Sequence, residues 1–454
     1  MTFQPPTSTP IRLQIQQLLD GRRRLRDELA LIEARAQQHA ELNALAWVDW
    51  ERAAAQADEA QQAADAAGAG SLPPRPLQGI FLTVKDLYKL DGAVTAAGTR
   101  AVLPDLGSQS EVVNRLQEAG AIVFAKTNMH EIALGATGEN PWTGDVRNPY
   151  DPARQAGGSS SGSGVAVACG IGTASVGSDT GGSVRIPAAF CGLVGFKPSY
   201  GAIPLRGALA LSWTCDHAGP LANSVDDAAQ VFEALSRRST RHGATPRRAR
   251  LGIPRQWLQG RLAPAVRESF ERLLVELSAG ADLVDADVRT MPLAWECYTP
   301  IVRAEGAWIH RAALAAGGEG FSELVSAPLK AGASISAAQY FDAMQGRRTF
   351  SEDLDRHLSG IDAMILPTSA VPPPLRGQQE AEVEGGRMSV REAVLGQTLP
   401  FSFAGVPTLS LPCGFHDGLP LGLQVVGRRE ADASLLSLGR WLEQRLSGLS
   451  AAPS

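Results

Sequence analysis

The chain has 454 residues, 44% of them hydrophobic and 20% charged, so it can bury a sizeable core in one large domain or in up to about three smaller ones. Its 42 basic and 47 acidic residues give a formal net charge of −5, which indicates neither a nucleic-acid partner nor an anionic membrane. Five cysteines without CxxC spacing argue against a disulfide framework or a zinc site and fit a reducing compartment. No run approaches the ~18 apolar residues of a membrane span, and residues 1–19 lack the pattern of a secretory leader, so we expect a cytoplasmic protein.

The first seventy residues have the pattern of a helical segment. Apolar residues recur at helical spacing from Ile11 to Ile32, and the part that follows is rich in strong helix formers. This pattern predicts helix over residues 11–68, ended by the breaker sequence GSLPPRP. We interpret residues 1–70 as a helical segment that packs on a core formed by residues 71–454.

From residue 77 the pattern changes to short apolar runs that alternate with an amphipathic segment. LQGIFLTVKDL (77–87) and AIVFAKT (121–127) are typical of buried strands. Between them, SEVVNRLQEAG (110–120) predicts a helix closed by Gly120. The alternation of strand and helix predicts an α/β sheet.

The second half of the chain supplies further elements. We expect a helix over 218–236 with Ser224 as its N-cap, and a mainly helical lobe at about 240–350. The basic stretch 237–252 predicts a solvated loop, with a nucleic-acid-binding arm as the minor alternative. The remaining predictions are strands at 362–368, 400–415 and 419–427, a Pro-rich loop at 372–377, and a closing helix at 433–446.

Two segments rich in glycine and serine stand in the middle of the chain, QAGGSSSGSGVAVACG (155–170) and GSDTGGSVRIPAAFCG (177–192). A phosphate-binding P-loop needs GxxxxGK[ST], and no Lys or Arg follows these glycines in register. A flexible linker is an equally poor interpretation, because uncharged apolar residues continue the first segment and must be buried. The glycines then permit close packing, while the serine hydroxyls either satisfy buried backbone groups or take part in chemistry.

The sequence DTGGS ends at Ser183, and its residue types indicate that this serine can act as a nucleophile. Successive N–H groups can converge there into a nest that binds an oxyanion. These N–H groups belong to Thr180, Gly181, Gly182 and Ser183. None of the seven histidines lies in a motif such as GxSxG that would build a Ser–His–Asp relay. Lys85, in the apolar run FLTVKDL, is the better candidate base because burial lowers the pKa of a lysine, although it can equally be a structural salt-bridge partner of Asp86.

Four parts of the sequence together resemble the amidase signature family of serine hydrolases. They are VKD (84–86), GGSSSGSG (157–164), GSDTGGSVRIPAAFCGLVGFKPSYG (177–201), and PFSFAGVPTLSLPCGF with GLPLGLQVVG (400–427). The resemblance implies an α/β fold with a mixed central β-sheet sandwiched by helices, and a Ser–cis-Ser–Lys triad. By position the triad residues are Lys85, Ser159 and Ser183. Ser161 stands where the family often has glycine.

The resemblance also implies a mechanism. Ser183 attacks the substrate carbonyl, Ser159 relays the proton towards the neutral amine of Lys85, and the N–H groups of residues 180–183 stabilise the oxyanion. Three further residues are expected to support these loops: Ser160, Asp179 and Arg185. The resemblance implies no cofactor, and no cluster of residues has the spacing of a metal site.

The resemblance places the stretch NMHEIALGATGEN (128–140) beside the bond that is cleaved. Its face formed by Ala133, Leu134 and Gly135 is small and apolar, which favours an apolar or aryl group on the substrate. Aromatic side chains from elsewhere in the chain are further candidates for the pocket: Trp213, Trp308 and Tyr340.

We therefore expect a serine hydrolase that cleaves the C–N bonds of carboxamides with an apolar or aryl group through an acyl-enzyme, and plausibly those of carbamates (urethanes). Two alternatives share the triad, namely a urea-type (ureido or allophanate-like) hydrolase and the amidase component of a glutamine amidotransferase. A non-catalytic scaffold would need the triad broken, whereas Lys85, Ser159 and Ser183 are all present. We expect a small-molecule substrate, no nucleic-acid or membrane partner, and a monomer or homodimer.

Overall fold

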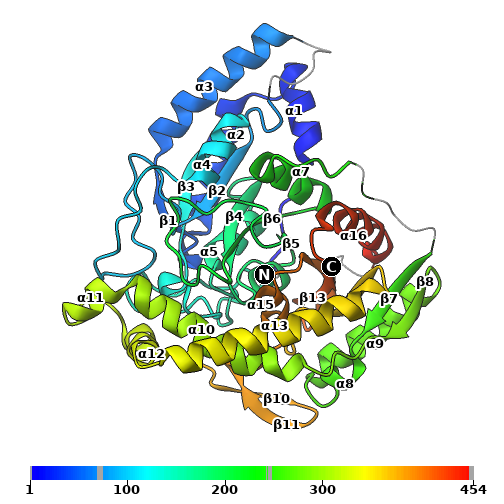
Figure 1. Ribbon diagram of the computed structural model, residues 1–454. Coiled ribbons are helices and arrows are strands. Elements are labelled where there is room, and N and C mark those ends of the chain that lie inside the picture. Colours follow the sequence, from blue (N-terminus) through cyan, green and yellow to red (C-terminus); the bar gives the residue numbers. More distant parts are fainter. Residues whose placement is uncertain (1–2, 69–74, 242, 244–247, 449–454) are drawn as a thin grey trace.

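A mixed β-sheet runs through the centre of the protein (Figure 1). The computed structural model describes residues 3–68, 75–241, 243 and 248–448. Within these ranges eleven strands form the sheet, in the order β1-β3-β2-β4-β6-β5-β12-β13-β9-β7-β8. Their bounds are β1 Leu45–Val48, β2 Phe81–Lys85, β3 Ile122–Thr127, β4 Ala174–Asp179, β5 Val194–Lys197, β6 His217–Ala222, β7 Ala249–Ile253, β8 Ala281–Asp285, β9 Ala363–Pro367, β12 Thr408–His416 and β13 Leu419–Val426. A separate hairpin pairs β10 (Glu380–Val383) with β11 (Gly386–Ser389).

Helices flank this sheet (Figure 1). In the first half of the chain they are α1 Ile11–Leu19, α2 Leu25–Gln38, α3 Trp50–Ala67, α4 Glu111–Glu118, α5 Ser161–Ala168, α6 Arg185–Phe190 and α7 Val225–Ser236, with short 3₁₀ turns η1 Ala40–Leu42 and η2 Glu131–Ala133. In the second half they are α8 Arg255–Leu258, α9 Pro264–Ser278, α10 Met291–Ile309, α11 Arg311–Ala315, α12 Glu323–Ala333, α13 Ala337–Ser359, α14 Val390–Leu395, α15 Leu399–Ala404 and α16 Asp432–Leu446. α5 lies against β2 and β4, α6 against β5 and β13, α7 against β6, and α16 against β12. The predicted α/β fold with a mixed sheet between helices is confirmed.

The sheet brings the ends of two neighbouring strands together. β2 and β4 are parallel, with Val84 opposite Val176. Parallel strands end at the same edge of a sheet, so Lys85 at the end of β2 comes beside Ser178 and Asp179 at the end of β4. Both strands are buried along their whole length, which agrees with the mainly apolar sequence FLTVK of β2 and with the small residues of β4.

The prediction of helix over 11–68 is wrong in part. The chain leaves α1 through Gly21, whose φ is +69°, and turns again at Asn43, whose φ is +58°. Between α2 and α3 it forms β1, which pairs antiparallel with β3 and joins the central sheet. The predicted breaker at 70–76 and the boundary at residue 70 fall largely on residues 69–74, which lie outside the described residues, so that division stays a prediction.

Two predictions in the second half need correction. The segment 218–236 begins with most of β6, and its helix starts after Ser224, whose hydroxyl accepts a hydrogen bond from Asp227 N (3.1 Å). The segment 400–415 contains most of helix α15, ended by Gly405 at φ +75°, before β12 begins. The described part of the lobe at about 240–350 is mainly helical, as expected, and it also contains β7 and β8, which pair in parallel and extend the sheet.

The other predicted elements are present. The strands β2, β3, β9 and β13 and the helices α4 and α16 lie where the sequence places them. The basic stretch 237–252 falls partly outside the described residues, and its last part forms the start of β7. In the described part of the chain, no helix combines the length and apolarity that crossing a bilayer requires.

Candidate active site

Lys85 ends β2 with its side chain fully buried. Its Nζ donates hydrogen bonds to Ser159 Oγ (2.6 Å) and Ser178 Oγ (2.8 Å). Burial lowers the pKa of Lys85 to about 7, although the carboxylates of Asp216 and Asp179 act in the opposite direction. The amine is therefore neutral in a large fraction of molecules near neutral pH.

Asp86 does not pair with Lys85. Its carboxylate forms an ion pair with Lys126 Nζ on β3, at 2.7 Å. The alternative interpretation of Lys85 as the salt-bridge partner of Asp86 is therefore wrong.

Ser159 lies in the loop that precedes α5. The Gly158–Ser159 peptide bond is cis, and the Ser159 side chain is fully buried. The backbone of this loop is held from two sides, because Ser159 O accepts a hydrogen bond from His130 N (3.1 Å) and Ser160 N donates one to Ser183 O (3.3 Å). Ser160 Oγ donates to Ser178 O (3.1 Å), so its hydroxyl is occupied within the loops around Lys85.

Ser183 follows a turn that only glycine fits. Gly182 has a φ of +143°, and a Cβ at this position would lie 2.2 Å from Thr398 Oγ1. The Thr180 hydroxyl donates to Asp216 Oδ1 (2.6 Å), and Thr398 Oγ1 donates to Gly181 O (2.7 Å). No described residue accepts a hydrogen bond from the N–H groups of residues 180–183, so these donors remain available to a ligand.

A buried ion pair between Arg185 and Asp179 stabilises the turn that precedes Ser183. Arg185 Nη2 lies 2.9 Å from Asp179 Oδ1, and Arg185 Nε donates to Asp179 Oδ2 (3.0 Å). Both side chains are fully buried. Burial acts to raise the pKa of Asp179, but the charge of Arg185 outweighs it and the pKa is lowered. Asp179 Oδ2 also accepts from Val184 N (3.2 Å), which ties the residue after Ser183 to the end of β4.

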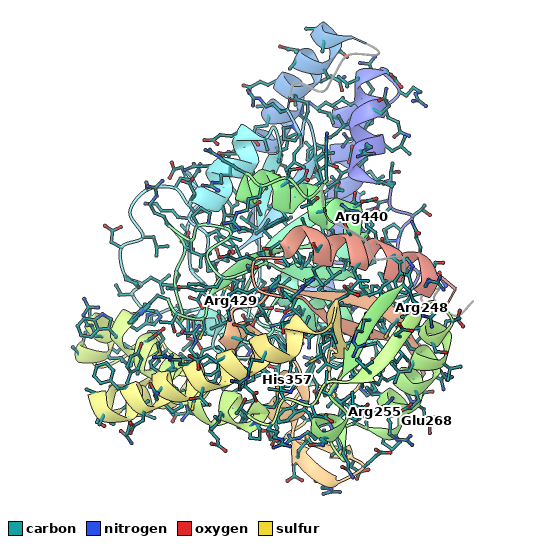
Figure 2. The ribbon with its side chains drawn as sticks, turned by 45° about the vertical axis from the view of Figure 1, so that its right-hand side comes forward. Arg248, Arg255, Glu268, His357, Arg429 and Arg440 are labelled. Atoms are coloured by element: carbon teal, nitrogen blue, oxygen red, sulfur yellow. The ribbon has the colours of Figure 1, made fainter. Side chains whose placement is uncertain are left out.

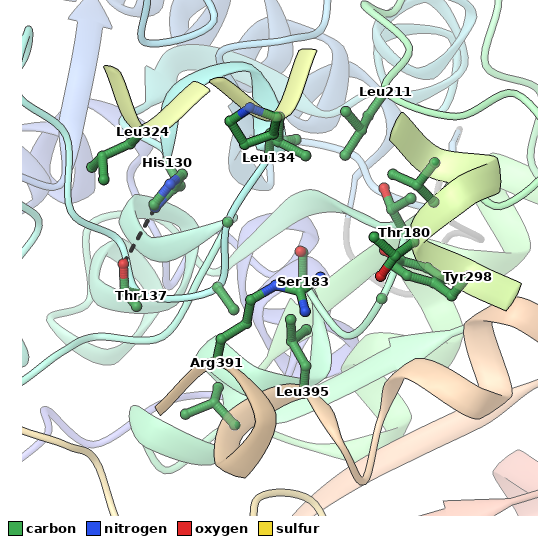
Figure 3. Close-up of a pocket in the computed structure, with 18 of the residues that line it drawn as sticks. His130, Leu134, Thr137, Thr180, Ser183, Leu211, Tyr298, Leu324, Arg391 and Leu395 are labelled. Atoms are coloured by element: carbon green, nitrogen blue, oxygen red, sulfur yellow. Dashed lines mark hydrogen bonds between the residues drawn. The ribbon is translucent and has the colours of Figure 1, made fainter. Parts of the chain in front are cut away.

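Ser183 opens onto a cavity of about 270 Å³ (Figure 3). Ala133, Leu134 and Gly135 line it, as the sequence predicts. Gly135 packs directly on His130, because a Cβ there would lie 2.0 Å from the His130 Nε2 atom. Burial lowers the pKa of His130 to about 4, so this ring is neutral at neutral pH.

None of the three aromatic candidates lines this cavity. Trp213 does not line this cavity, and its side chain is 44% exposed. Trp308, 60% exposed, lies outside the lining as well. Tyr340 also lies outside it and donates its hydroxyl hydrogen bond to Glu305 Oε1 (2.7 Å).

Comparisons with known proteins show the family of this chain. The amidase family model matches residues 29–436. The chain belongs to the amidase signature family. It is 33% identical to the A subunit of glutamyl-tRNA(Gln) amidotransferase from Symbiobacterium thermophilum, over 84% of this chain and 85% of that protein. It is 32% identical to the AtzE subunit of 1-carboxybiuret hydrolase from Pseudomonas sp. (strain ADP), over 88% and 91% of the two chains. A crystal structure described as an amidase superposes with a TM-score of 0.93 at 47% identity, covering 96% of this chain and 100% of the other.

This amidase-signature protein is therefore an enzyme that hydrolyses C–N bonds. Some of its relatives are named as subunits of larger complexes. Among the residues that the structure describes, no group of three or more His, Cys, Asp or Glu side chains is placed to hold a metal ion. All five cysteines are free thiols.

Several residues that line the cavity of this amidase carry no sequence signal. Tyr298 and Arg303 come from α10, Leu324 from α12, and Arg391 from α14. These elements lie far along the chain from the glycine-rich segments, and tertiary packing alone brings them to Ser183. Glu131 helps to hold this arrangement, because its carboxylate accepts a hydrogen bond from Ser322 N (3.2 Å) just before α12.

Proposed function

We propose that this enzyme hydrolyses small carboxamides that carry an apolar or aryl group, through an acyl-enzyme on Ser183, and that it accepts carbamates of the same shape. The observation that carries the proposal is the 2.6 Å contact between the buried Lys85 amine and the Ser159 hydroxyl, next to a cavity onto which Ser183 opens. A neutral amine, a relay hydroxyl and an accessible hydroxyl are the parts that nucleophilic catalysis on an amide requires.

The contact between Lys85 and Ser159 is the base end of the proton relay that we propose. Ser183 Oγ forms a bond to the carbonyl carbon while its proton passes to Ser159, and the Ser159 proton passes to the Lys85 amine. The N–H groups of residues 180–183 hold the oxyanion, and each such donor is typically worth about 10²–10³-fold in rate. When the C–N bond breaks, Ser159 returns the proton to the leaving nitrogen. Water then cleaves the ester through the same relay, which regenerates Ser183.

The cavity walls support an apolar substrate. Aliphatic residues form much of the lining, among them Leu134, Leu211, Val302, Leu324, Val394 and Leu395. Glu139 is the carboxylate of the lining, and it already accepts hydrogen bonds from Gly377 N (2.7 Å) and Thr137 Oγ1 (3.1 Å). An α-amino acid such as glutamine would need a carboxylate to bind its ammonium group, and among the described residues the lining offers only Glu139, which already holds two hydrogen bonds.

A panel of substrates tests the proposal. We would compare kcat/KM for an aryl acetamide, an N-aryl carbamate, an aryl ester, a ureido acid and glutamine. The relatives' names make the ureido acid and glutamine the relevant competitors. We expect the aryl acetamide or the carbamate to be preferred among the C–N substrates. A preference of more than tenfold for glutamine or for the ureido acid would contradict the proposal.

A further inference from the structure

Two arginines line the cavity that contains Ser183. Arg303 comes from α10 and Arg391 from α14. Figure 3 shows the Arg391 side chain reaching from its helix into the cavity in the direction of Ser183. Neither guanidinium forms an ion pair or a hydrogen bond with any described residue.

Arg303 and Arg391 differ from the arginines of this protein whose charge is met by a carboxylate. Many surface arginines pair with an aspartate, among them Arg248, Arg255, Arg429 and Arg440 (Figure 2). Two carboxylates of this region have other partners. Glu392, next to Arg391 in sequence, pairs with Arg261 at 3.2 Å, and Glu139 of the cavity lining accepts from Gly377 N. Among the described residues, no carboxylate lies within ion-pair distance of Arg303 or Arg391.

The position of Arg391 is defined although it lacks an ionic partner. Its guanidinium carbon lies 5.0 Å from the centre of the Trp295 ring, a cation–π arrangement that orients the group. Partial desolvation lowers the pKa of Arg391, and the charge of Arg303 acts in the same direction. Two like charges that face one cavity favour an anion between or beside them.

Tyr298 adds a third donor to the same wall. Burial raises the pKa of Tyr298 well above its usual value, so the phenol keeps its proton. No described residue accepts a hydrogen bond from its hydroxyl, and a Cβ on Gly181 would lie 2.7 Å from this oxygen. Tyr298, Arg303 and Arg391 thus offer hydrogen-bond donors to the cavity. A ligand group that accepts hydrogen bonds and carries negative charge complements these donors.

We propose that the substrate of this enzyme is an amide that carries a carboxylate, and that Arg391, together with Arg303, binds that carboxylate while the amide carbonyl lies at Ser183. The inference rests on the proposed amide hydrolysis at Ser183. The apolar or aryl part of the substrate then lies along the aliphatic wall, between the two polar ends. Arg391 is a specificity-determining residue and takes no part in proton transfer.

Two matched pairs of substrates test this inference. Succinanilate against butyranilide places the carboxylate on the acyl side, and 4-acetamidobenzoate against 4-methylacetanilide places it on the leaving side. A hydrogen bond to a charged group is worth about 1.5–3 kcal/mol, or roughly tenfold to a hundredfold. We expect the wild type to prefer one carboxylate amide over its neutral match by this factor in kcat/KM. In Arg391→Met the ratio is expected to fall to about one, mostly through KM, because the contact is the same in the ground state and the transition state.

Two further variants give controls. Arg387→Met removes an arginine on β11 that pairs with Glu380 (3.5 Å) and Glu382 (3.3 Å), outside the cavity lining, and should keep the wild-type ratio. Arg391→Lys keeps the charge without the two parallel donors, and should recover part of the preference. Circular dichroism verifies that each variant is folded.

A binding measurement separates this inference from the proposed function. Calorimetry on Ser183→Ala protein measures the affinity for succinanilate and 4-acetamidobenzoate without turnover, with and without Arg391→Met. Cleavage of neutral and carboxylate amides at equal rates, with equal binding to both Arg391 forms, would overturn the inference and leave amide hydrolysis standing. Binding that depends on Arg391, with no amide cleaved by the wild type, would overturn the proposed function and retain the carboxylate site.

Discussion

The acid limb of the pH–rate profile reports directly on Lys85. Its pKa falls from 10.5 to about 7 on burial, so at pH 7 about half of the enzyme holds a neutral amine, against about one molecule in three thousand for an ordinary lysine. Burial of Lys85 therefore raises the fraction of enzyme with a neutral base at pH 7 by roughly a thousandfold, and the rate rises in proportion to this fraction. We predict that kcat/KM for a neutral amide is level above about pH 8 and falls tenfold per pH unit well below pH 7.

The sign of the limb follows from the proton balance. Below the pKa of Lys85 the amine is protonated and cannot accept the proton from Ser159, so activity is lost as the pH falls. The assay is kcat/KM for 4-methylacetanilide between pH 5 and 10, with circular dichroism at each pH to confirm the fold. The neutral substrate removes any titration of its own. A profile that stays level down to pH 5, or an inflection above pH 9, would refute the assignment of Lys85 as the base.

Three further predictions concern single substitutions. Ser183→Ala should abolish turnover of any amide that the wild type cleaves, with an unchanged thermal midpoint, because no described residue hydrogen-bonds the lost hydroxyl. Lys126→Met leaves Asp86 buried without its counter-ion, and should cost about 3–5 kcal/mol in the free energy of unfolding measured with denaturant; a loss below about 1 kcal/mol would contradict the buried pair. Gly135→Ala forces the His130 ring to move, and should cost about 1–3 kcal/mol of stability and lower kcat/KM; wild-type values for both would show that the wall of the cavity is more adaptable than this contact implies.

Part of the sheet was predictable from the sequence, because several of its strands are buried on both faces. The continuous apolar runs FLTVK and IVFAKT form β2 and β3 as expected. The N-terminal segment was predicted less well. Its helical periodicity is real, since Ile15, Leu18 and Leu29 are buried, but periodicity does not reveal where the chain turns between helices. The strand β1 is only four residues long, and its pairing with β3 depends on a partner distant in sequence.

Some residues of the candidate site were predictable from the sequence and others were not. Residues from the two glycine-rich segments were found because backbone constraints leave a local signal, as the close contact at Gly182 illustrates. Arg303, Arg391 and Tyr298 were missed, since an arginine on a helix has the same sequence pattern whether it faces solvent or a cavity. Trp213 was a candidate for the pocket but does not line the cavity, because the sequence does not reveal which surface a large aromatic side chain covers.

The two lysines on adjacent strands show why chemistry cannot be assigned from residue type and burial alone. Lys85 on β2 and Lys126 on β3 are both fully shielded by apolar strand residues, and burial lowers the pKa of each. Lys126 has a carboxylate at 2.7 Å, which stabilises its charged form and makes it a structural ion pair. Among the described residues, Lys85 Nζ forms hydrogen bonds only with the hydroxyls of Ser159 and Ser178. These hydroxyls are neutral, so they do not stabilise the charged form of the amine as a carboxylate would. Asp86 is next to Lys85 in sequence, yet its side chain reaches the lysine of the neighbouring strand. Because Asp86 pairs with Lys126, Lys85 has no ion-pair partner in the described part of the chain and can act as a base.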